Sequence, residues 1–226
     1  ARFVVQTSAI NTADGIEYAK HAEGLGADAV MVLPPYFEGP DQNGVRDHYE
    51  RIARATRTPI MVYNIPQATN IDITPDFFRE LLEIDNIEYI KDSTADLVRI
   101  QQLLTTGGTV FNGADPIAFA AFVAGCPGAV WGAVNAVPAE AVALYDLVSA
   151  DKLNEARALW RRMLPLQLFL WEHVYNAAAK AATNLSGRPV GPCRLPVQPL
   201  DETAMAALEA ALASLSETAP SERIAV

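Results

Sequence analysis

The stretch Ile-Glu-Tyr-Ile-Lys-Asp-Ser, residues 87–93, decides how the rest of the chain is interpreted. It is largely apolar up to Lys91, a pattern typical of a parallel strand that is covered on both faces and ends at a polar site. The other three lysines fall in stretches with a helical pattern, where a solvated role is the default: Lys20, Lys152 and Lys180. Lys91 alone therefore stands where a functional lysine is expected.

Short apolar runs of the same kind recur along the chain at intervals of about one strand-helix unit. They predict six parallel strands, at 2–9, 29–33, 59–65, 87–91, 109–113 and 129–134. Amphipathic stretches between them predict helices, among them 12–25, 44–56 and 74–82. From residue 137 onward the strand pattern stops, and we predict helices at 139–148, 152–164, 166–185 and 202–215, before a polar tail at 216–226.

This succession predicts an α/β fold that is either an open parallel sheet or a barrel. The glycine-rich phosphate fingerprint of an open dinucleotide-binding sheet is missing from the sequence. Gly24 and Gly26 are better explained as the cap of a helix. In both architectures ligands bind at the carboxyl ends of the strands, so the residues there are the candidates for function.

Lys91 is flanked by Ile90, and an amine in such a place is desolvated. Desolvation favours the neutral amine, which can attack a keto group to give a carbinolamine and then an imine. The alternative is a structural lysine paired with Asp92 or another carboxylate. The position of Lys91 alone favours neither the catalytic nor the structural hypothesis. One unit earlier, the run Met-Val-Tyr-Asn-Ile-Pro places Tyr63 at the end of the adjacent strand. There its phenol could relay protons, or its ring could be a core aromatic.

Five motifs in order extend this pattern over essentially the whole chain. They are Pro34-Pro35-Tyr36, Tyr63-Asn64-Ile65-Pro66, Ile90-Lys91-Asp92-Ser93, Asn112-Gly113-Ala114-Asp115 and Arg188-Pro189-Val190-Gly191-Pro192. As an ordered set they resemble the dihydrodipicolinate synthase and N-acetylneuraminate lyase family. The resemblance implies a (β/α)8 TIM barrel with C-terminal helices, in which a lysine forms an imine with pyruvate or another 2-keto acid. It also implies that the enzyme needs no cofactor, because the substrate itself binds covalently to the lysine.

Carried over residue by residue, the resemblance makes Lys91 the Schiff-base lysine and Tyr63 the phenolic proton relay. It also implies that Gly113 and Asp115 border the substrate channel and that backbone around Val130 helps to hold the keto acid. We predict further substrate contacts from side chains near two other strand ends: Thr7, Ser8, Tyr36 and Phe37.

The resemblance leaves the family's first two βα units without a counterpart, because Lys91 would end the sixth strand and 2–9 would be the third. An unclosed six-stranded barrel would expose two long strand edges, so we expect the chain to be a fragment or to lack its N-terminal segment. Residues 1–136 are expected to hold barrel units three to eight. Residues 137–226 are expected to form the last barrel helix and the C-terminal helices of the same domain.

Two residues depart from the synthases of this family. Phe37 stands where these enzymes commonly have a second tyrosine of the proton relay, and a phenyl ring cannot pass a proton. Ala68 stands where an arginine usually receives the carboxylate of the aldehyde substrate, and losing a bidentate donor weakens that recognition.

The main prediction is therefore a Schiff-base lyase, either an aldolase or a dehydratase, that acts on a pyruvate-like keto acid such as a 2-keto-3-deoxy sugar acid. The alternatives are 4-hydroxy-tetrahydrodipicolinate (dihydrodipicolinate) synthase of lysine biosynthesis and a non-catalytic keto-acid-binding homologue. The loop 35–40 carries an aromatic pair that in this family packs against a neighbouring subunit. A homo-oligomer is predicted, a tetramer built as a dimer of dimers.

Composition excludes several other classes. The net charge of -10 disfavours nucleic acid as a partner, and no apolar run reaches the roughly 20 residues of a membrane span. The histidines, His21, His48 and His173, fall in helical stretches, which disfavours a metal site. The two cysteines, Cys126 and Cys193, are far apart and predict reduced thiols in a cytoplasmic protein without a metal.

Overall fold

The computed structural model describes residues 2–37 and 39–216, which form two compact units. The first comprises the chain up to Ala114 together with Ala124–Val130, and the second comprises Asp115–Val123 and the chain from Trp131 onward. The predicted division at residue 136 within one domain stays a prediction, and each unit is described here by itself.

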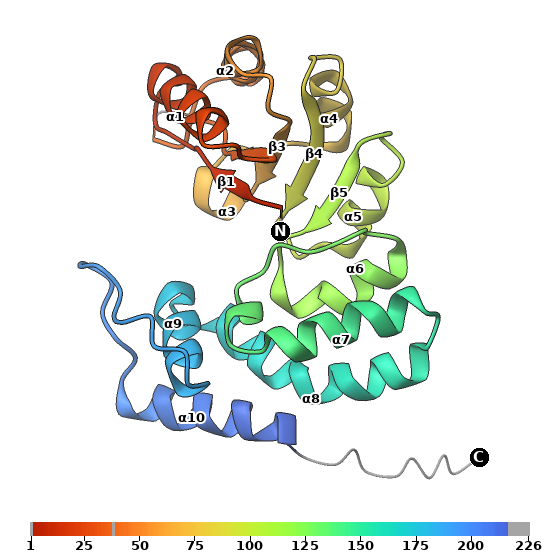
Figure 1. Cartoon of the computed structure of the whole chain (residues 1–226), viewed down its shortest axis with the longest axis vertical. Helices are drawn as coiled ribbons and strands as arrows, with labels where there is room; N and C mark the ends of the chain where they lie inside the picture. Colours follow the sequence, from red (N-terminus) through yellow and green to blue (C-terminus); the bar gives the residue numbers. More distant parts are fainter. Residues whose placement is uncertain (1, 38, 217–226) are drawn as a thin grey trace. The chain divides into compact units, whose positions relative to one another are not determined.

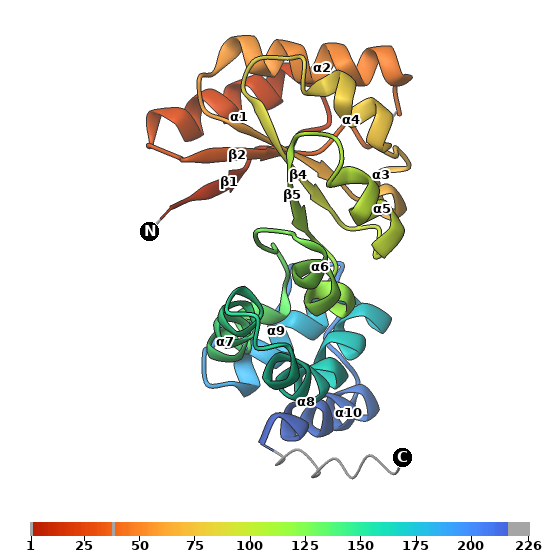
Figure 2. The ribbon, with the colours of Figure 1, turned by 90° about the vertical axis from the view of Figure 1, so that its right-hand side faces the viewer.

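The first unit is a sheet of five parallel strands that follow one another in chain order (Figure 1). They are β1 (Val4–Gln6), β2 (Ala29–Val32), β3 (Ile60–Asn64), β4 (Ile87–Asp92) and β5 (Thr109–Asn112). Helices lie along one side of this sheet (Figures 1 and 2): α1 (Thr12–Gly24), α2 (Gln42–Ala55), α3 (Pro66–Thr69), α4 (Pro75–Leu81) and α5 (Leu97–Leu103). Five of the six predicted strands are thus confirmed, and β1 is shorter than its apolar run.

The predicted strand at 129–134 is wrong beyond its first residue. Ala129 forms an isolated parallel bridge with Asn112, and Ala133–Asn135 is a turn of 3-10 helix, η2. Val130 N still donates to the Asn112 carbonyl of β5, but the amides of Gly132 and Ala133 bond to side chains instead of a neighbouring strand. Gly132 N donates to the Tyr175 hydroxyl at 2.7 Å and Ala133 N to Asp115 Oδ1 at 2.9 Å. An apolar run alone does not reveal such partners.

Side-chain caps explain where the first unit's helices begin. The side chains of Asn11, Asp41, Thr74 and Asp96 accept from amides in the first turns of α1, α2, α4 and α5. Each such cap contributes about 1 kcal/mol. Gly26, at φ +81°, follows the end of α1 in a conformation that L side chains rarely adopt, which confirms its predicted capping role.

The core of the first unit lies between the sheet and these helices. Its strand residues are fully buried, among them Val30, Ile60, Val62, Ile90 and Val110. Phe78, Ile100 and Leu103 of the covering helices are equally buried. Burying one such side chain contributes about 1.5–3 kcal/mol, so this layer is a major source of the stability that holds the strand ends in place.

The second unit is helical (Figure 2). It contains most of α6 (Ala118–Ala124) and all of α7 (Pro138–Ser149), α8 (Leu153–Glu172), α9 (Tyr175–Leu185) and α10 (Glu202–Ala213), with the short turns η1 (Asp115–Ile117) and η3 (Ser214–Ser216). The predicted polar tail begins at Ser216, and the rest of it lies outside the described residues.

The predicted helix boundary at Pro165 is wrong, because α8 continues through this proline. Proline inside a helix costs about 3 kcal/mol, since it removes one hydrogen bond and crowds the preceding turn. Buried residues continue on both sides of it, including Trp160, Met163, Leu166 and Leu170. The combined burial of these side chains outweighs the cost of the proline.

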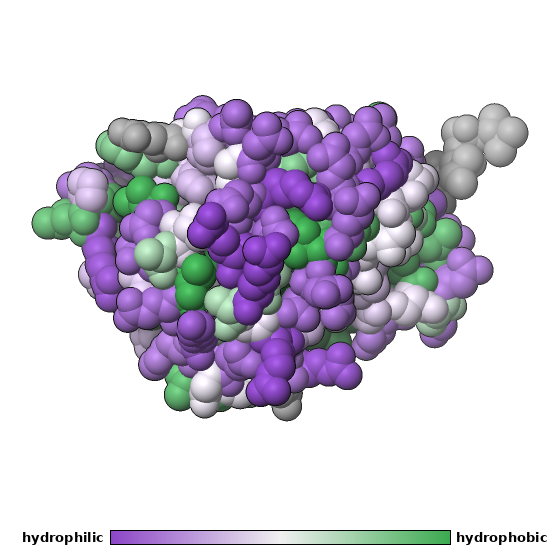
Figure 3. All heavy atoms as spheres, turned by 90° about the horizontal axis from the view of Figure 1, so that it is seen from above, coloured by the Kyte–Doolittle hydropathy of each residue, from purple (hydrophilic) through white to green (hydrophobic). Residues whose placement is uncertain are grey.

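The rest of the surface agrees with the composition. Most of the face seen from above is hydrophilic, with scattered apolar side chains (Figure 3). Cys126 and Cys193 are both free, and burial raises the pKa of the Cys126 thiol to about 11. Among the described residues, no helix combines the length and the hydropathy that crossing a bilayer requires.

Candidate active site

Lys91 and Tyr63 lie side by side at the carboxyl ends of two neighbouring strands. They are directly paired in the parallel register of β3 and β4. The Nζ atom of Lys91 lies over the Tyr63 ring, 3.9 Å from its centroid. Lys91 is only 8% exposed although it carries an amine, while Tyr63 is half-buried. When the amine is protonated, the face of the ring attracts it, so the contact holds the side chain in place.

A β-bulge in β4 creates this pairing. Ile60 pairs with Ile87, but the next residue, Met61, pairs with Tyr89, so that Glu88 is the extra residue. A register counted straight on from Ile60 would set Tyr63 opposite Ile90. Side chains alternate along a strand, so Lys91 would then lie on the opposite face of the sheet from Tyr63. The bulge is therefore a precondition of the contact.

The alternative of a structural ion pair is not supported by the geometry. Asp92 follows Lys91 directly and so faces the other side of the sheet. Its carboxylate accepts from Asn64 Nδ2 at 2.8 Å and from the backbone amide of Thr94 at 3.1 Å. Within residues 2–37 and 39–216, no ion pair of Lys91 is found.

Gly113 supplies the space in which the Lys91 side chain lies. A Cβ atom on this glycine would come within 2.6 Å of Lys91 Cε and 2.1 Å of Ser93 Oγ, closer than non-bonded atoms approach. Gly113 N also donates to the Asp92 carbonyl at 2.7 Å, which fixes its backbone beside β4. The structure thus brings predicted residue Gly113 together with Lys91.

Ser93 is a member of this cluster that was not predicted from the sequence. It follows Lys91 by two residues and shares its face of the sheet, and it is 2% exposed. Its hydroxyl is buried and has no hydrogen-bond partner within the described residues. A buried hydroxyl without a partner is costly and marks a place where a ligand atom could bond. The i, i+2 spacing from Lys91 was the signal that could have found it.

A buried polar network underlies the two strand ends on the helix-covered side. Asn64, fully buried, bridges Asp92 and Asp72 through its Nδ2 atom, and Asp72 forms a bidentate pair with Arg99 at 2.7 and 2.9 Å. The Arg99 guanidinium lowers the pKa of Asp72 below its usual value. Burial raises the pKa of Asp92 despite the hydrogen bonds that its carboxylate accepts.

Two further predicted residues have structural partners. Val130 N donates to the Asn112 carbonyl at 2.8 Å, so this amide is already used. Asp115, in the second unit, is fully buried and accepts from Ala133 N and from the Tyr175 hydroxyl at 2.6 Å. Burial raises the pKa of the Asp115 carboxyl. Their roles in substrate binding stay predictions.

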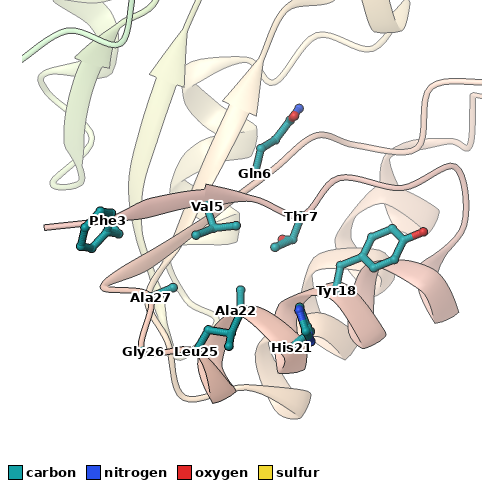
Figure 4. Close-up of a pocket in the computed structure, with 10 residues that line it drawn as sticks. All are labelled: Phe3, Val5, Gln6, Thr7, Tyr18, His21, Ala22, Leu25, Gly26 and Ala27. Carbon is teal, nitrogen blue, oxygen red and sulfur yellow. The ribbon is translucent and has the colours of Figure 1, made fainter.

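The structure does not place the remaining predicted residues in contact with Lys91. Ser8 Oγ accepts from Leu33 N at 2.8 Å. Thr7 lines a pocket of about 500 Å³ between β1 and α1, and its buried hydroxyl has no partner within the described residues (Figure 4). Tyr36 and Phe37 follow β2 and are 38% and 77% exposed.

Among the described residues, no group of three or more His, Cys, Asp and Glu side chains could hold a metal ion. His48 has a structural role instead. It is buried on α2, and its Nδ1 atom shares a hydrogen bond of 3.0 Å with the Thr12 hydroxyl. Burial lowers the pKa of His48 from 6.5 to about 4, which keeps the ring neutral near pH 7.

A desolvated amine and a phenol lie side by side at the carboxyl ends of parallel strands. These are the groups that an enzyme needs to form a Schiff base with a keto acid. The model of the dihydrodipicolinate synthetase family matches residues 2–215, and the chain belongs to this family. It is thus a lyase of the kind that forms a lysine-pyruvate imine, and its fold is that of the family's TIM barrels with C-terminal helices. Enzymes of this family need no external cofactor.

Two curated relatives agree on the family. The 4-hydroxy-tetrahydrodipicolinate synthase of Acidiphilium cryptum is 35% identical over 207 residues, which cover 90% of this chain and 71% of that protein. Its namesake from Syntrophobacter fumaroxidans is 33% identical over 201 residues, which cover 87% of this chain and 69% of that protein. The chain therefore spans about 70% of the length of these relatives.

Solved structures of the family superpose closely on the chain. Dihydrodipicolinate synthase from Acinetobacter baumannii, solved in complex with pyruvate, has a TM-score of 0.89 and 31% identity, covering 95% of this chain and 75% of that one. The 4-hydroxy-tetrahydrodipicolinate synthase of Methylacidiphilum fumariolicum has a TM-score of 0.90 and 30% identity, covering 95% and 73%.

Proposed function

We propose that Lys91 is the nucleophile that forms the imine with pyruvate or a pyruvate-like keto acid, and that Tyr63 transfers protons in the same reaction. The observation that carries this proposal is the position of Lys91 Nζ, 3.9 Å from the centroid of the Tyr63 ring. Of the lysines, Lys91 is the one that lies in a strand, and it is buried without an ion-pair partner in the described part of the chain.

The chemistry needs both groups. The neutral amine attacks the keto carbon, and the resulting carbinolamine must gain a proton on its oxygen before water leaves and the imine forms. A phenol held against the reacting nitrogen can deliver that proton and take another up in the reverse step. The imine then accepts the electrons of a carbon–hydrogen or carbon–carbon bond that breaks at the neighbouring carbon, which gives an enamine. The enamine gives these electrons back, either to form a new bond at that carbon or to expel a hydroxide from the next carbon.

For the second reactant, the names of the relatives favour the 4-hydroxy-tetrahydrodipicolinate synthase reaction. The curated relatives reported above carry this name, and the Acinetobacter baumannii enzyme was solved with pyruvate bound. In this reading the imine formed on Lys91 condenses with the family's aldehyde substrate. The comparisons support this candidate better than the sugar-acid reaction predicted from the sequence.

A 2-keto-3-deoxy sugar acid remains the second candidate because of two residues. Phe37 lacks the hydroxyl that a second tyrosine of the relay would carry, and it is 77% exposed. Ala68, on the exposed side of α3, cannot bind a carboxylate. These two residues disfavour the aldehyde of the synthase reaction, whose carboxylate needs a cationic partner.

Borohydride trapping tests the assignment of the lysine. Treatment with pyruvate and borohydride should reduce the imine to a stable secondary amine, and peptide mapping should place this single adduct on Lys91. Lys91→Arg keeps the positive charge, but its guanidinium stays protonated with a pKa above about 12, so adduct and turnover should both disappear. An adduct on Lys20, or turnover by Lys91→Arg, would contradict the proposal.

A product assay separates the candidates. Protein that forms the adduct is incubated in parallel with pyruvate plus the aldehyde and with a 2-keto-3-deoxy sugar acid. Turnover of one of them identifies the reaction. An adduct without turnover of either would favour the remaining alternative, a non-catalytic keto-acid-binding homologue.

The loop after β2 supports the proposal of a homo-oligomer, built as a dimer of dimers. Tyr36 and Phe37 expose 38% and 77% of their surface next to each other, and adjoining exposed aromatic rings favour a subunit contact. One solved relative is described as a monomeric variant of dihydrodipicolinate synthase, so the assembly must be measured. Solution scattering should give the mass of a tetramer, in a protein that we expect to be cytoplasmic.

A further inference from the structure

The buried network behind the strand ends contains Asn64, whose side chain takes no part in the proposed chemistry of Lys91 and Tyr63. Asn64 follows Tyr63 as Asp92 follows Lys91, and the register pairs Asn64 with Asp92 just as it pairs Tyr63 with Lys91. The two pairs face opposite sides of the sheet. A link between Asn64 and Asp92 therefore acts one residue away from the link between Tyr63 and Lys91.

The hydrogen bonds of Asn64 fix the orientation of its amide. Its Oδ1 atom accepts from Ile73 N at 2.9 Å, and its Nδ2 atom donates to Asp92 Oδ2 at 2.8 Å and to Asp72 Oδ1 at 3.1 Å. A flipped amide would set an oxygen against two carboxylates, so one orientation alone satisfies the site. The backbone carbonyl of Asn64 also accepts from Ser93 N at 2.9 Å.

The bulge explains why this end of the strand pair needs a lock. Because the register shifts between Ile60 and Met61, the beginning of the strands does not determine which residues pair at their ends. The Asn64–Asp92 hydrogen bond ties the side chains of the two strands together beyond the bulge. The Asp72–Arg99 pair holds the second acceptor of Asn64 in place.

We propose that Asn64 is a positioning residue that acts through Tyr63: its side chain clamps Asp92 and thereby keeps the Tyr63 phenol in register with the amine of Lys91. This inference rests on the proposed function of Lys91 and Tyr63. It assigns to Asn64 no contact with the substrate. Removing the clamp loosens the position of the phenol, and a small misplacement of a proton donor lowers the rate steeply.

A double-mutant cycle tests the inference, with Asn64→Ala measured in the native and the Tyr63→Phe backgrounds. In the native background kcat should fall by about 10- to 100-fold. In the Tyr63→Phe background the same substitution should change kcat by less than about 3-fold, because no phenol is left to position. The borohydride adduct with pyruvate should still form on Lys91 in both backgrounds.

Asn112→Ala is the matched control. Asn112 is also a fully buried asparagine at a strand end, but within the described residues its side chain bonds to Ala114 alone, in its own loop. Its replacement should lower kcat by the same factor in both backgrounds, whatever that factor is. An equal factor for Asn64→Ala in both backgrounds would show that Asn64 is merely structural and would overturn the inference alone. Full activity of Tyr63→Phe would instead overturn the proposed function, and the inference with it.

Asn64→Asp keeps the inference testable if Asn64→Ala does not fold. The new carboxyl group has the shape of the amide and can still accept from Ile73 N, but it faces the carboxylates of Asp92 and Asp72. When protonated it can donate to Asp92. Like charges raise the pKa of one of the carboxyl groups, so a lower pH protonates it. The kcat of Asn64→Asp relative to that of the native chain should therefore rise by about 10-fold as the pH falls by one or two units. A ratio that is flat or falls toward low pH would contradict the clamp.

Discussion

The Cα atom of Gly113 faces Ser93 so closely that a Cβ atom on it would lie 2.1 Å from Ser93 Oγ. The same atom would lie 2.6 Å from Lys91 Cε, so any side chain at this position displaces the lysine. Gly113 is thus required because the Lys91 side chain occupies the space beside it, and not because of its own backbone conformation.

Gly113→Ala should therefore lower turnover by on the order of 100-fold, the cost of misplacing a reacting group by about 1 Å. Overpacking should also reduce the free energy of unfolding by about 1–3 kcal/mol. Steady-state kinetics and urea denaturation measure the two effects. Gly24→Ala is the control, because a Cβ atom there meets nothing within 4 Å. Native-like kinetics in Gly113→Ala would contradict the packing argument.

Tyr63→Phe should slow turnover by about 100-fold while the fold stays intact, because the ring remains against Lys91 and only the proton-transferring hydroxyl is lost. Stopped-flow measurement of imine formation with pyruvate, together with steady-state kinetics, checks this. Tyr18→Phe removes the hydroxyl of a tyrosine that is 49% exposed on α1 and should leave the rate unchanged. A rate within 3-fold of native for Tyr63→Phe would exclude the relay.

Ser93→Ala should leave the free energy of unfolding unchanged or raise it by up to about 1 kcal/mol. The Ser93 hydroxyl is buried without a partner in the described residues, so its removal breaks no hydrogen bond. It also removes the cost of keeping an unbonded hydroxyl away from water. Urea denaturation measures the effect. Thr69→Ala is the contrasting variant, because the buried Thr69 hydroxyl donates to the carbonyls of Ile65 and Ile71 and its loss should destabilise the chain. A clear loss of stability in Ser93→Ala would mean that its hydroxyl is bonded.

His48 should make the chain less stable as the pH falls from 6.5 toward 4. Its pKa is lowered from 6.5 to about 4 by burial, so in this window the unfolded chain binds a proton that the folded chain excludes. Folding stability therefore rises with pH through the window and is fully present above 6.5. At about 1.36 kcal/mol per pKa unit, the loss by pH 4 is about 3 kcal/mol.

The difference between the native chain and His48→Gln, measured by urea denaturation across this window, isolates the contribution of His48. His21→Gln is the matched control, because His21 is exposed on α1. The pH dependence of the native chain should be flatter in His48→Gln and unaltered in His21→Gln. Equal slopes in all three proteins would show that His48 is free to ionise in the folded state.

The residues of the site were easier to predict than their pairing. Apolar runs that carry Lys91 and Tyr63 near their carboxyl ends were enough to place both residues at neighbouring strand ends, because parallel strands share one carboxyl edge. The bulge at Glu88, which decides that the two side chains share a face, has no signal in the run Ile-Glu-Tyr-Ile. Only the hydrogen bonds between β3 and β4 reveal it.

The misplaced elements have a common cause. The run at 129–134 is apolar, but its amides at Gly132 and Ala133 bond to Tyr175 and Asp115, which are distant in sequence. Pro165 breaks a helix by local rules, but buried side chains on both sides of it keep α8 continuous. In both cases tertiary contacts override the local pattern, and a single sequence does not show these contacts.

The outer edge of the first unit bears on how this chain is handled. Within the described residues β1 pairs with β2 alone, and three residues at this edge, Phe3, Val4 and Val5, are 63%, 46% and 39% exposed. A strand with free backbone groups and apolar side chains is a template for another chain. Association through this edge should therefore increase with the concentration of the purified sample. A charged residue in place of Val4, such as Val4→Lys, is the change to make before crystallisation trials.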